Sequence, residues 1–267
     1  MSLAQHGAAV QLWGRREAAL AETAALLDAV RPGSGVVQSV DVRDAEAVEA
    51  AMDLAFAAGP VTGVVNGAAA NFVAPTAGLS PRAYRAVAST VMDGSYYVTH
   101  AAGTRWLDAG LPGAVVSLLT TWVWTGSAYT VPSAMAKAAV HAMTMSLAAE
   151  WGPRGIRLNA VAPGPIRTDY AWDVLDPGRD DVVGATDPRG VPAGRLGSAE
   201  EVAHLVAFLL SDACDYLTGE TIAMDGGQRL AGPGTFAPLG ALTADDWARI
   251  RERARAASEA SRAQRSE

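Results

Sequence analysis

Several features that would indicate a secreted, membrane or nucleic-acid-binding protein are scarce in this 267-residue chain. Its single cysteine, Cys214, excludes an internal disulfide and fits a reducing compartment. No apolar run reaches the roughly 18 residues that a membrane span needs, and no signal peptide opens the chain. The formal net charge of −7 disfavours nucleic acid and anionic membranes, and the 4 histidines lack metal-ligand spacing. We therefore expect a cytoplasmic protein without a metal, nucleic-acid or membrane partner.

Short apolar segments that read as strands alternate with segments that read as helices. Strands are expected at residues 8–13, 35–40, 62–66, 114–118, 157–161 and 221–224. Helices are expected to begin near Arg16, Ala45, Pro81, Ser133 and Ala199. This alternation predicts an α/β fold with a doubly wound parallel sheet that binds ligands at the carboxyl ends of its strands.

The length and the absence of a linker indicate one domain over residues 1–267. Residues 228–267 form a C-terminal extension of this domain. It starts with a Gly/Pro-rich segment, continues with a helix from about Ala244, and ends in a polar tail.

A small-residue helix, a short apolar strand and a Pro-Gly turn follow one another within residues 131–169. The helix carries Lys137 four positions after Ser133. The turn after the strand contains Pro163, Gly164 and Ile166, with Thr168 just beyond it. This order and spacing resembles the short-chain dehydrogenase/reductase family. The resemblance implies that Lys137 holds a nicotinamide ribose and that the four residues of the turn segment hold the nicotinamide ring.

No glycine-rich turn precedes this block, although a dinucleotide-binding fold opens with a strand, such a turn and a helix. Residues 1–14 read instead as a helix end, a turn and the second strand. Compared with a βαβ unit of about 30 residues, roughly 25 residues are missing. We therefore expect the first strand and the Gly-rich loop to be absent. Either the start of the sequence is placed too late, or the protein has lost its pyrophosphate cradle, with a rearranged sheet or a partner filling the gap.

Other residues point to a cofactor. Arg15 and Arg16 follow the second strand, where an enzyme that uses NAD holds the ribose with an acid. A guanidinium group pairs with phosphate, so this placement favours NADP, and a solvated basic turn is the alternative reading. By resemblance, Asp41 and Val42 contact the adenine, and Asn66 begins the turn after the fourth strand of the family.

A closer resemblance, to the 2,4-dienoyl-CoA reductase branch of the family, covers the chain from the second strand to the tail. It rests on residues 71–84, 125–143, 146–157, 163–168, 194–212 and 242–250. It implies hydride transfer from NADPH to a conjugated dienoyl thioester, followed by protonation of the dienolate. By resemblance, Asn71 binds the thioester carbonyl, Phe72 and Ser80 line the acyl-CoA channel, Ser133 completes the polar network, and Arg43 meets the CoA phosphates.

The proton donor is the point at which the sequence departs from this branch. The branch's catalytic tyrosine falls on Trp122, whose indole can donate a hydrogen bond but cannot act as a general acid. The usual family tyrosine falls on Ser133, and the asparagine of the catalytic tetrad falls on Asp93. Proton delivery stays open among Asp93, Tyr129 and a water held by Asn71 and Ser133.

Aromatic residues gather at the expected rim of the site: Trp124, Tyr129, Tyr170 and Trp172. They indicate a flat or bulky small-molecule substrate, and lid packing is the alternative interpretation. The helix that carries Lys137 builds the dimer interface in this family, so the resemblance implies a homo-oligomer, commonly a tetramer.

The sequence therefore predicts a reductase that uses NADPH on an enone, dienoyl or related carbonyl substrate. A protein of the same fold without redox activity is the alternative. It would be a cofactor-free lyase, cyclase or isomerase, or a silent partner subunit.

Overall fold

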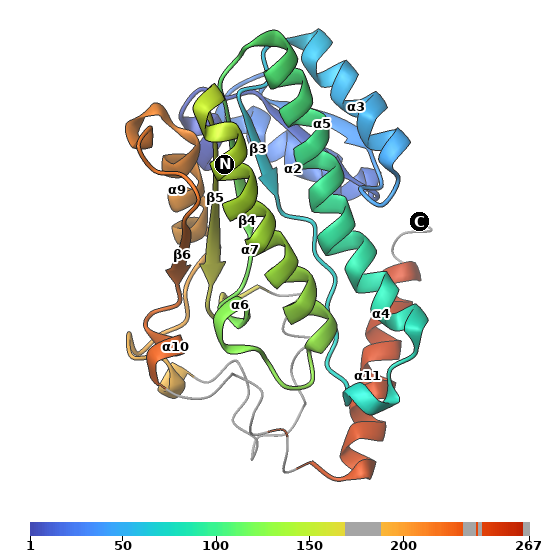
Figure 1. Ribbon diagram of the computed structural model, residues 1–267. Coiled ribbons are helices and arrows are strands. Elements are labelled where there is room, and N and C mark those ends of the chain that lie inside the picture. The colour runs from blue at the N-terminus through green and yellow to red at the C-terminus, as the bar shows by residue number, and fades with distance from the viewer. Residues whose placement is uncertain (169–187, 232–238, 240–241, 264–267) are drawn as a thin grey trace.

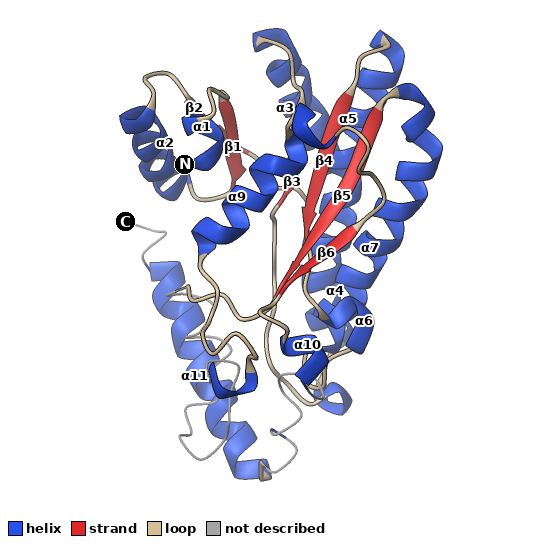
Figure 2. Ribbon diagram, turned by 90° about the vertical axis from the view of Figure 1, so that its left-hand side faces the viewer, coloured by secondary structure: helices blue, strands red, loops and turns tan. Residues whose placement is uncertain are grey.

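Strands form where the sequence predicts them (Figures 1 and 2). The computed structural model describes residues 1–168, 188–231, 239 and 242–263. In this part of the chain the strands are β1 (Val10–Gly14), β2 (Gly35–Ser39), β3 (Gly63–Asn66), β4 (Gly113–Leu118), β5 (Ile156–Pro163) and β6 (Thr221–Met224). Their ends differ from the expected ones by no more than 2 residues. The pattern of apolar segments was therefore sufficient to locate the strands.

The strands are all parallel, but they form two sheets. One sheet pairs β1 with β2, and the other has the order β3-β4-β5-β6. The parallel α/β fold is confirmed. The sheet is divided, because no strand of the described residues is hydrogen-bonded between β1 and β3, where the strand order of a doubly wound fold places its first strand. In the larger sheet, Asn66 of β3 lies opposite Ser117 of β4, and Ser117 lies opposite Ala160 of β5. The carboxyl ends of these strands therefore meet at one edge.

Helices flank both sheets. They are α1 (Ser2–Gln5), α2 (Glu17–Val30), α3 (Ala45–Ala58), α4 (Pro81–Ala88), α5 (Gly94–Ala109), α6 (Trp122–Thr125), α7 (Val131–Trp151), α9 (Ala199–Leu210), α10 (Gln228–Ala231) and α11 (Ala244–Ala263). The helices near Arg16, Ala45, Pro81, Ser133 and Ala199 begin within 2 residues of the expected positions. The Asp44 side chain accepts hydrogen bonds from two amides at the start of α3, and Ser198 forms a capping box with Glu201 in α9.

The larger sheet lies between helices. Figures 1 and 2 show α5 and α7 on one face and α9 on the other. α4 runs into α5 through a π-helical turn, Ser89–Asp93, which packs against α7. The outer face of α7 exposes Met135 and Met145. The homo-oligomer expected through this helix stays a prediction. Among the described helices, none has the length and apolar character needed to cross a membrane.

Two tryptophans fill the core where α5 and α7 cover the sheet. Trp106 is fully buried, and its indole nitrogen donates a hydrogen bond to the carbonyl of Val61 over 2.7 Å. Trp151, at the end of α7, packs against Gly103 of α5, where an added Cβ would lie 2.3 Å from the indole ring. A glycine at position 103 is therefore what allows α5 to approach α7 so closely.

Because α5 and α7 are so close at Gly103, a methyl group added at this position should destabilise the fold. Gly103→Ala forces the Trp151 ring or α5 to move, so it should lower the free energy of unfolding by about 1–3 kcal/mol. Urea denaturation of the purified protein measures this. Gly78→Ala is the matched control, because Gly78 is exposed, has no positive φ, and meets nothing within 4 Å of an added Cβ apart from its chain neighbours. Equal stabilities of the two variants would contradict the packing argument.

Candidate active site

The most unusual group at the carboxyl edge of the larger sheet is the amine of Lys137, the only lysine in the chain. Lys137 is 9% exposed, and its Nζ donates a hydrogen bond to the carbonyl of Leu118, the last residue of β4. Burial lowers the pKa of Lys137 from 10.5 to about 8. The fold therefore holds a cation in an environment that disfavours its charge, which is a common feature of functional sites.

Ser133 shares the face of α7 that carries Lys137, because side chains four residues apart in a helix lie above one another. It is 4% exposed and lies in the first turn of α7, after Thr130 at the N-cap position. The spacing that the sequence analysis singled out is therefore a real juxtaposition of two buried polar side chains.

Asn66 joins the ends of β3 and β4 to α5. Its Nδ2 donates to Thr99 Oγ1 over 2.8 Å and to Ser117 Oγ over 3.2 Å. All three side chains are buried. Asn66 was expected in the cofactor site, and the structure uses its amide nitrogen to hold the edge of the sheet together. Any contact between Asn66 and a cofactor would therefore involve atoms of Asn66 other than this nitrogen.

The loop that follows β3 brings Asn71 and Phe72 toward α7. Asn71 Oδ1 accepts a hydrogen bond from the Phe72 amide over 2.9 Å. Its amide nitrogen is then the atom that can donate to a substrate carbonyl. The Phe72 side chain packs with Val87, Val91 and Ala136, the residue directly before Lys137. The loop that carries Asn71 therefore packs on α7 next to the residue that precedes the buried lysine.

The expected proton-donor positions lie on different elements. Asp93 is partly buried at the end of the π-helical turn, a type of helix distortion that is frequent at functional sites. Trp122 is the first residue of α6, and like Tyr129 it packs against a buried apolar cluster that contains Trp247. Of these side chains, Asp93 and Tyr129 belong to residue types that can exchange a proton, and Trp122 does not.

The residues expected at the adenosine end gather beyond the ends of β1 and β2. Arg43 donates from Nε to both carboxylate oxygens of Asp41, over 2.9 and 3.0 Å. Hydrogen bonds from Arg43 and, to a smaller degree, the charge of Arg15 lower the pKa of Asp41. The Asp41 carboxylate and the Arg43 guanidinium therefore bind one another, which the expected contacts with adenine and CoA did not include. Val42 packs against Gly94 at the start of α5.

The Pro-Gly turn crosses closely over the end of β6. The Gly164 amide donates to the carbonyl of Met224 over 3.0 Å, and a Cβ at Gly164 would lie 2.7 Å from the Cα of Asp225. Ile166 forms a parallel bridge with Gly197, and Thr168 is exposed. The turn is therefore fixed by backbone contacts. Tyr170 and Trp172 lie outside the described residues.

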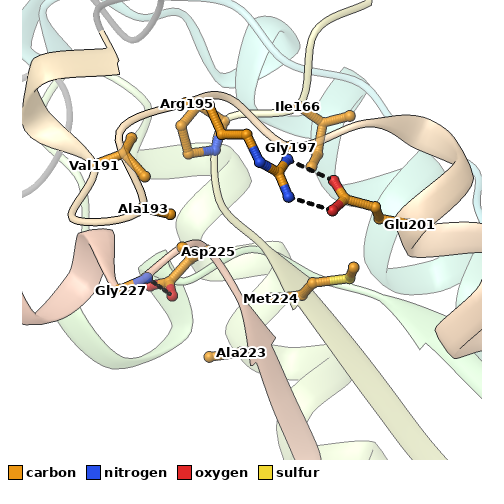
Figure 3. A pocket seen from close by; sticks show the side chains of 12 residues that line it. Ile166, Val191, Ala193, Arg195, Gly197, Glu201, Ala223, Met224, Asp225 and Gly227 are labelled. Atoms are coloured by element: carbon orange, nitrogen blue, oxygen red, sulfur yellow. Dashed lines mark hydrogen bonds and ion pairs between the residues drawn. The ribbon is translucent and has the colours of Figure 1, made fainter.

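A cavity of about 310 Å³ borders this turn (Figure 3). Pro165, Ile166 and Asp225 line it, together with the ion pair between Arg195 and Glu201. Neither Lys137 nor Ser133 is among its lining residues. We assign the site from the polar groups around Lys137, because those groups carry the chemistry and this cavity does not contain them.

Ser80 and Trp124, which were expected to line the channel and the rim of the site, make contacts within the protein. Ser80 is exposed, and its Oγ accepts a hydrogen bond from the Ala83 amide at the start of α4. This capping role explains the serine without an acyl channel. Trp124 is 41% exposed, lies 4.9 Å from the guanidinium of Arg229, and meets the ring of His141 edge-on. Of the aromatic residues expected at the rim of the site, Trp124 therefore has an exposed ring.

Comparison with known proteins identifies the family of the chain. Residues 1–229 match the family described as enoyl-(acyl carrier protein) reductase. The chain belongs to the short-chain dehydrogenase/reductase family. It is an oxidoreductase of this family. Within the described residues, no group of three or more His, Cys, Asp or Glu side chains is placed to hold a metal ion.

Several relatives carry the same type of name. A Bacillus subtilis protein named "Probable 2,4-dienoyl-CoA reductase [(2E)-enoyl-CoA-producing]" is 39% identical over 230 residues, which is 85% of this chain and 89% of the relative. A Caenorhabditis elegans protein named "Probable 2,4-dienoyl-CoA reductase decr-1.2 [(3E)-enoyl-CoA-producing]" is 37% identical and covers 83% of this chain and 72% of its own length.

Solved structures show the same fold. A short-chain dehydrogenase from Bacillus anthracis superposes with a TM-score of 0.76 at 34% identity, covering 85% of this chain and 88% of that chain. A gluconate 5-dehydrogenase from Burkholderia cenocepacia, solved with NADP and tartrate, superposes with a TM-score of 0.79 at 28% identity, over 86% of this chain and 89% of that chain.

Sequence reasoning missed two contacts of the site. The carbonyl that binds Lys137 belongs to Leu118, and no side-chain pattern indicates a backbone acceptor. Trp247 of α11 packs on Tyr129 at a ring separation of 4.7 Å. Its segment was noted for its resemblance to the family, but contact with a residue 118 positions earlier has no local signal.

The buried amine predicts a dependence of stability on pH. In the folded state the pKa of Lys137 is lowered to about 8, so between pH 8 and 10.5 the unfolded chain binds more protons than the folded one. The folded state is therefore penalised below pH 8, and the penalty disappears as pH rises toward 10.5. The stability advantage of Lys137→Met over the wild type should be largest near pH 7 and shrink by up to ~1.4 kcal/mol per pH unit above pH 8.

Urea denaturation between pH 7 and 10.5 measures this trend. Arg154→Met is the control, because Arg154 also donates to a backbone carbonyl, that of Leu107, and is exposed. Arginine does not titrate in this range, so the difference between this control and the wild type should be flat. A flat difference for Lys137→Met would mean that the amine is not buried.

Proposed function

We propose that this chain uses NADPH to reduce a conjugated enoyl or dienoyl thioester, with Lys137, Ser133 and Asn71 around the reacting carbonyl. The observation that carries the proposal is the buried amine of Lys137, held at the carboxyl end of β4 on the same helical face as Ser133. The names of the relatives at 37–39% identity support the choice of substrate class.

In this proposal each side chain has a role that its environment supports. NADPH, when bound, supplies a hydride. Asn71 donates from its amide nitrogen to the thioester carbonyl, since its oxygen is bonded to the Phe72 amide. The ammonium of Lys137 stabilises the negative charge that develops on that oxygen, and low local polarity strengthens this effect. Asp93, Tyr129 or a water held by Asn71 and Ser133 delivers the proton.

The described residues fit two parts of the cofactor. Arg15 and Arg16 follow β1, near enough to Asp41 for the charge of Arg15 to lower its pKa, and both are exposed. They would hold the 2′-phosphate. Lys137 and the Pro-Gly turn at Gly164 would hold the nicotinamide ribose and ring. Within the described residues, no glycine-rich turn between a strand and a helix is placed to hold the pyrophosphate, and the turn between β1 and α2 carries the two arginines instead. We therefore expect the 267-residue chain to bind NADPH weakly.

One observation favours a second candidate, an enzyme of this fold without redox chemistry. Trp122 replaces the phenol of the branch, and its ring belongs to an apolar cluster with Tyr129 and Trp247. A site with an aromatic surface and no phenol at that position suits a lyase, cyclase or isomerase. Arg15, Arg16 and Lys137 favour the reductase. A cofactor-free enzyme has no use for arginines that bind a 2′-phosphate or for a lysine that binds a nicotinamide ribose.

The paired arginines predict a preference for NADPH over NADH. Removing the contact with the 2′-phosphate by Arg15→Ala/Arg16→Ala should weaken NADPH binding by roughly ten- to a hundred-fold, the equivalent of one charged hydrogen bond. NADH binding should change little. Titration calorimetry with both cofactors measures this, with Arg154→Ala as an exposed arginine away from the site. Equal affinities of the wild type for the two cofactors would refute the proposed contact.

The absent phenol predicts the outcome of restoring it. The test follows NADPH oxidation with a 2,4-dienoyl-CoA. Lys137→Ala should lose most activity, because it removes the ribose contact and the positive charge. Trp122→Tyr should increase turnover if protonation limits the rate, by up to the ~10²–10⁴-fold that general acids contribute. A folded Trp122→Tyr protein that binds NADPH but reduces no dienoyl-CoA would refute the reductase and favour the second candidate.

A further inference from the structure

The C-terminal helix α11 reaches the surroundings of the proposed acyl site. Trp247 and Ile250 of α11 are buried with Val73, two residues after Asn71. Trp122 and Tyr129 pack against the same cluster and are themselves only partly buried. We call the rings of Trp122, Tyr129 and Trp247 the aromatic wall. The rings of Trp122 and Tyr129 keep exposed surface, whereas Trp247 is 7% exposed and its ring contacts that of Tyr129.

Tyr129 is held in a backbone conformation that a residue with a side chain seldom adopts. Its φ is +64°, and it is the only residue other than glycine with a positive φ among the described residues. Strain of this kind persists where surrounding contacts fix the residue, and it concentrates at functional sites. Two contacts fix Tyr129. Its carbonyl accepts a hydrogen bond from the Ala74 amide over 2.9 Å, and its ring lies 4.7 Å from that of Trp247.

The start of α11 is itself anchored, so Trp247 has a defined position. Asp246 is 3% exposed and accepts hydrogen bonds from the amide and hydroxyl of Thr243, while Thr243 Oγ1 accepts from the Asp246 amide. Such a reciprocal cap fixes the first turn of a helix. Trp247 is the next residue, and it is therefore directed to Tyr129 by a rigid helix end.

We propose that the aromatic wall binds the flat, conjugated part of the acyl chain and that Trp247 is the positioning residue that holds Tyr129 in place. This inference rests on the proposed function for its substrate class. The Trp122 and Tyr129 rings offer flat apolar surface next to the loop that carries Asn71, and a planar π-system stacks on such rings better than a flexible saturated chain. α11 therefore contributes to substrate selection although it lies more than 100 positions after the other two rings in the sequence.

The test is a binding measurement that needs no turnover. Titration calorimetry without NADPH compares 2,4-decadienoyl-CoA with decanoyl-CoA, which has the same length but no conjugation. The wild type should prefer the dienoyl thioester several-fold. One aromatic stacking contact is worth about a three- to ten-fold preference, so Trp247→Leu should remove most of the preference, whereas Trp247→Phe should keep most of it. Ile250→Ala, in the same cluster and helix, should leave the preference unchanged.

A double variant tests whether Trp247 acts through Tyr129. Asparagine tolerates a positive φ, so Tyr129→Asn removes the ring without adding backbone strain. If Trp247 acts through Tyr129, Tyr129→Asn/Trp247→Leu should lose no more preference than Tyr129→Asn alone. If Trp247→Leu does not fold, the loss of preference for the dienoyl thioester in Tyr129→Asn is the result that tests the aromatic wall.

Several results would overturn the inference: a wild type without the preference, an unchanged preference in Trp247→Leu or Tyr129→Asn, or an equal loss in Ile250→Ala. A protein that binds the dienoyl thioester selectively through the aromatic wall but never reduces it would refute the proposed function. It would not contradict the inference about the aromatic wall.

Discussion

The hydrogen bond from the Lys137 amine to the Leu118 carbonyl is the contact around which the site is organised. It joins α7 to the carboxyl end of β4, where Ser117 and Asn66 already link β4 to β3. Because Lys137 is buried, its charge can persist only with such a partner, and its pKa falls to about 8. Ser133, four residues earlier in α7, is buried on the same face of the helix. α7 also packs along β5, so removing the contact would release the Lys137 amine from the strand end on which the chemistry depends and leave the helix in place.

The periodicity of the sequence was enough to locate the strands and most helices, because nearly continuous apolar segments are typical of buried parallel strands. The four-residue spacing of Ser133 and Lys137 likewise placed two polar groups on one helical face. The division of the sheet between β1 and β3 falls where the strand order of a doubly wound fold places its first strand, which the sequence analysis expects to be absent. α5 was not predicted as a separate helix, because the π-helical turn that joins it to α4 leaves no break in the sequence pattern.

For the functional residues too, the sequence did not show which groups would become partners in the folded chain. Family resemblance named Asp41 and Arg43 for different ligands, whereas geometry pairs them with one another. It assigned Ser80 to a channel, whereas the side chain caps a helix. These roles were missed because short polar side chains serve backbone and ligand equally well, and only the folded chain shows which partner is within reach. The clustering of Trp122 and Tyr129 with α11 belongs to the same class of long-range contact.

The central claim, that the Lys137 amine is a buried group with a lowered pKa, can be tested directly because the chain has a single lysine. Incorporation of lysine labelled with ¹³C at Cε gives one side-chain resonance, which needs no assignment. Titration of the folded protein by NMR should show a midpoint near pH 8, and the protein unfolded in urea should show one near 10.5. A midpoint near 10.5 in the folded protein would contradict the buried site and the role built on it.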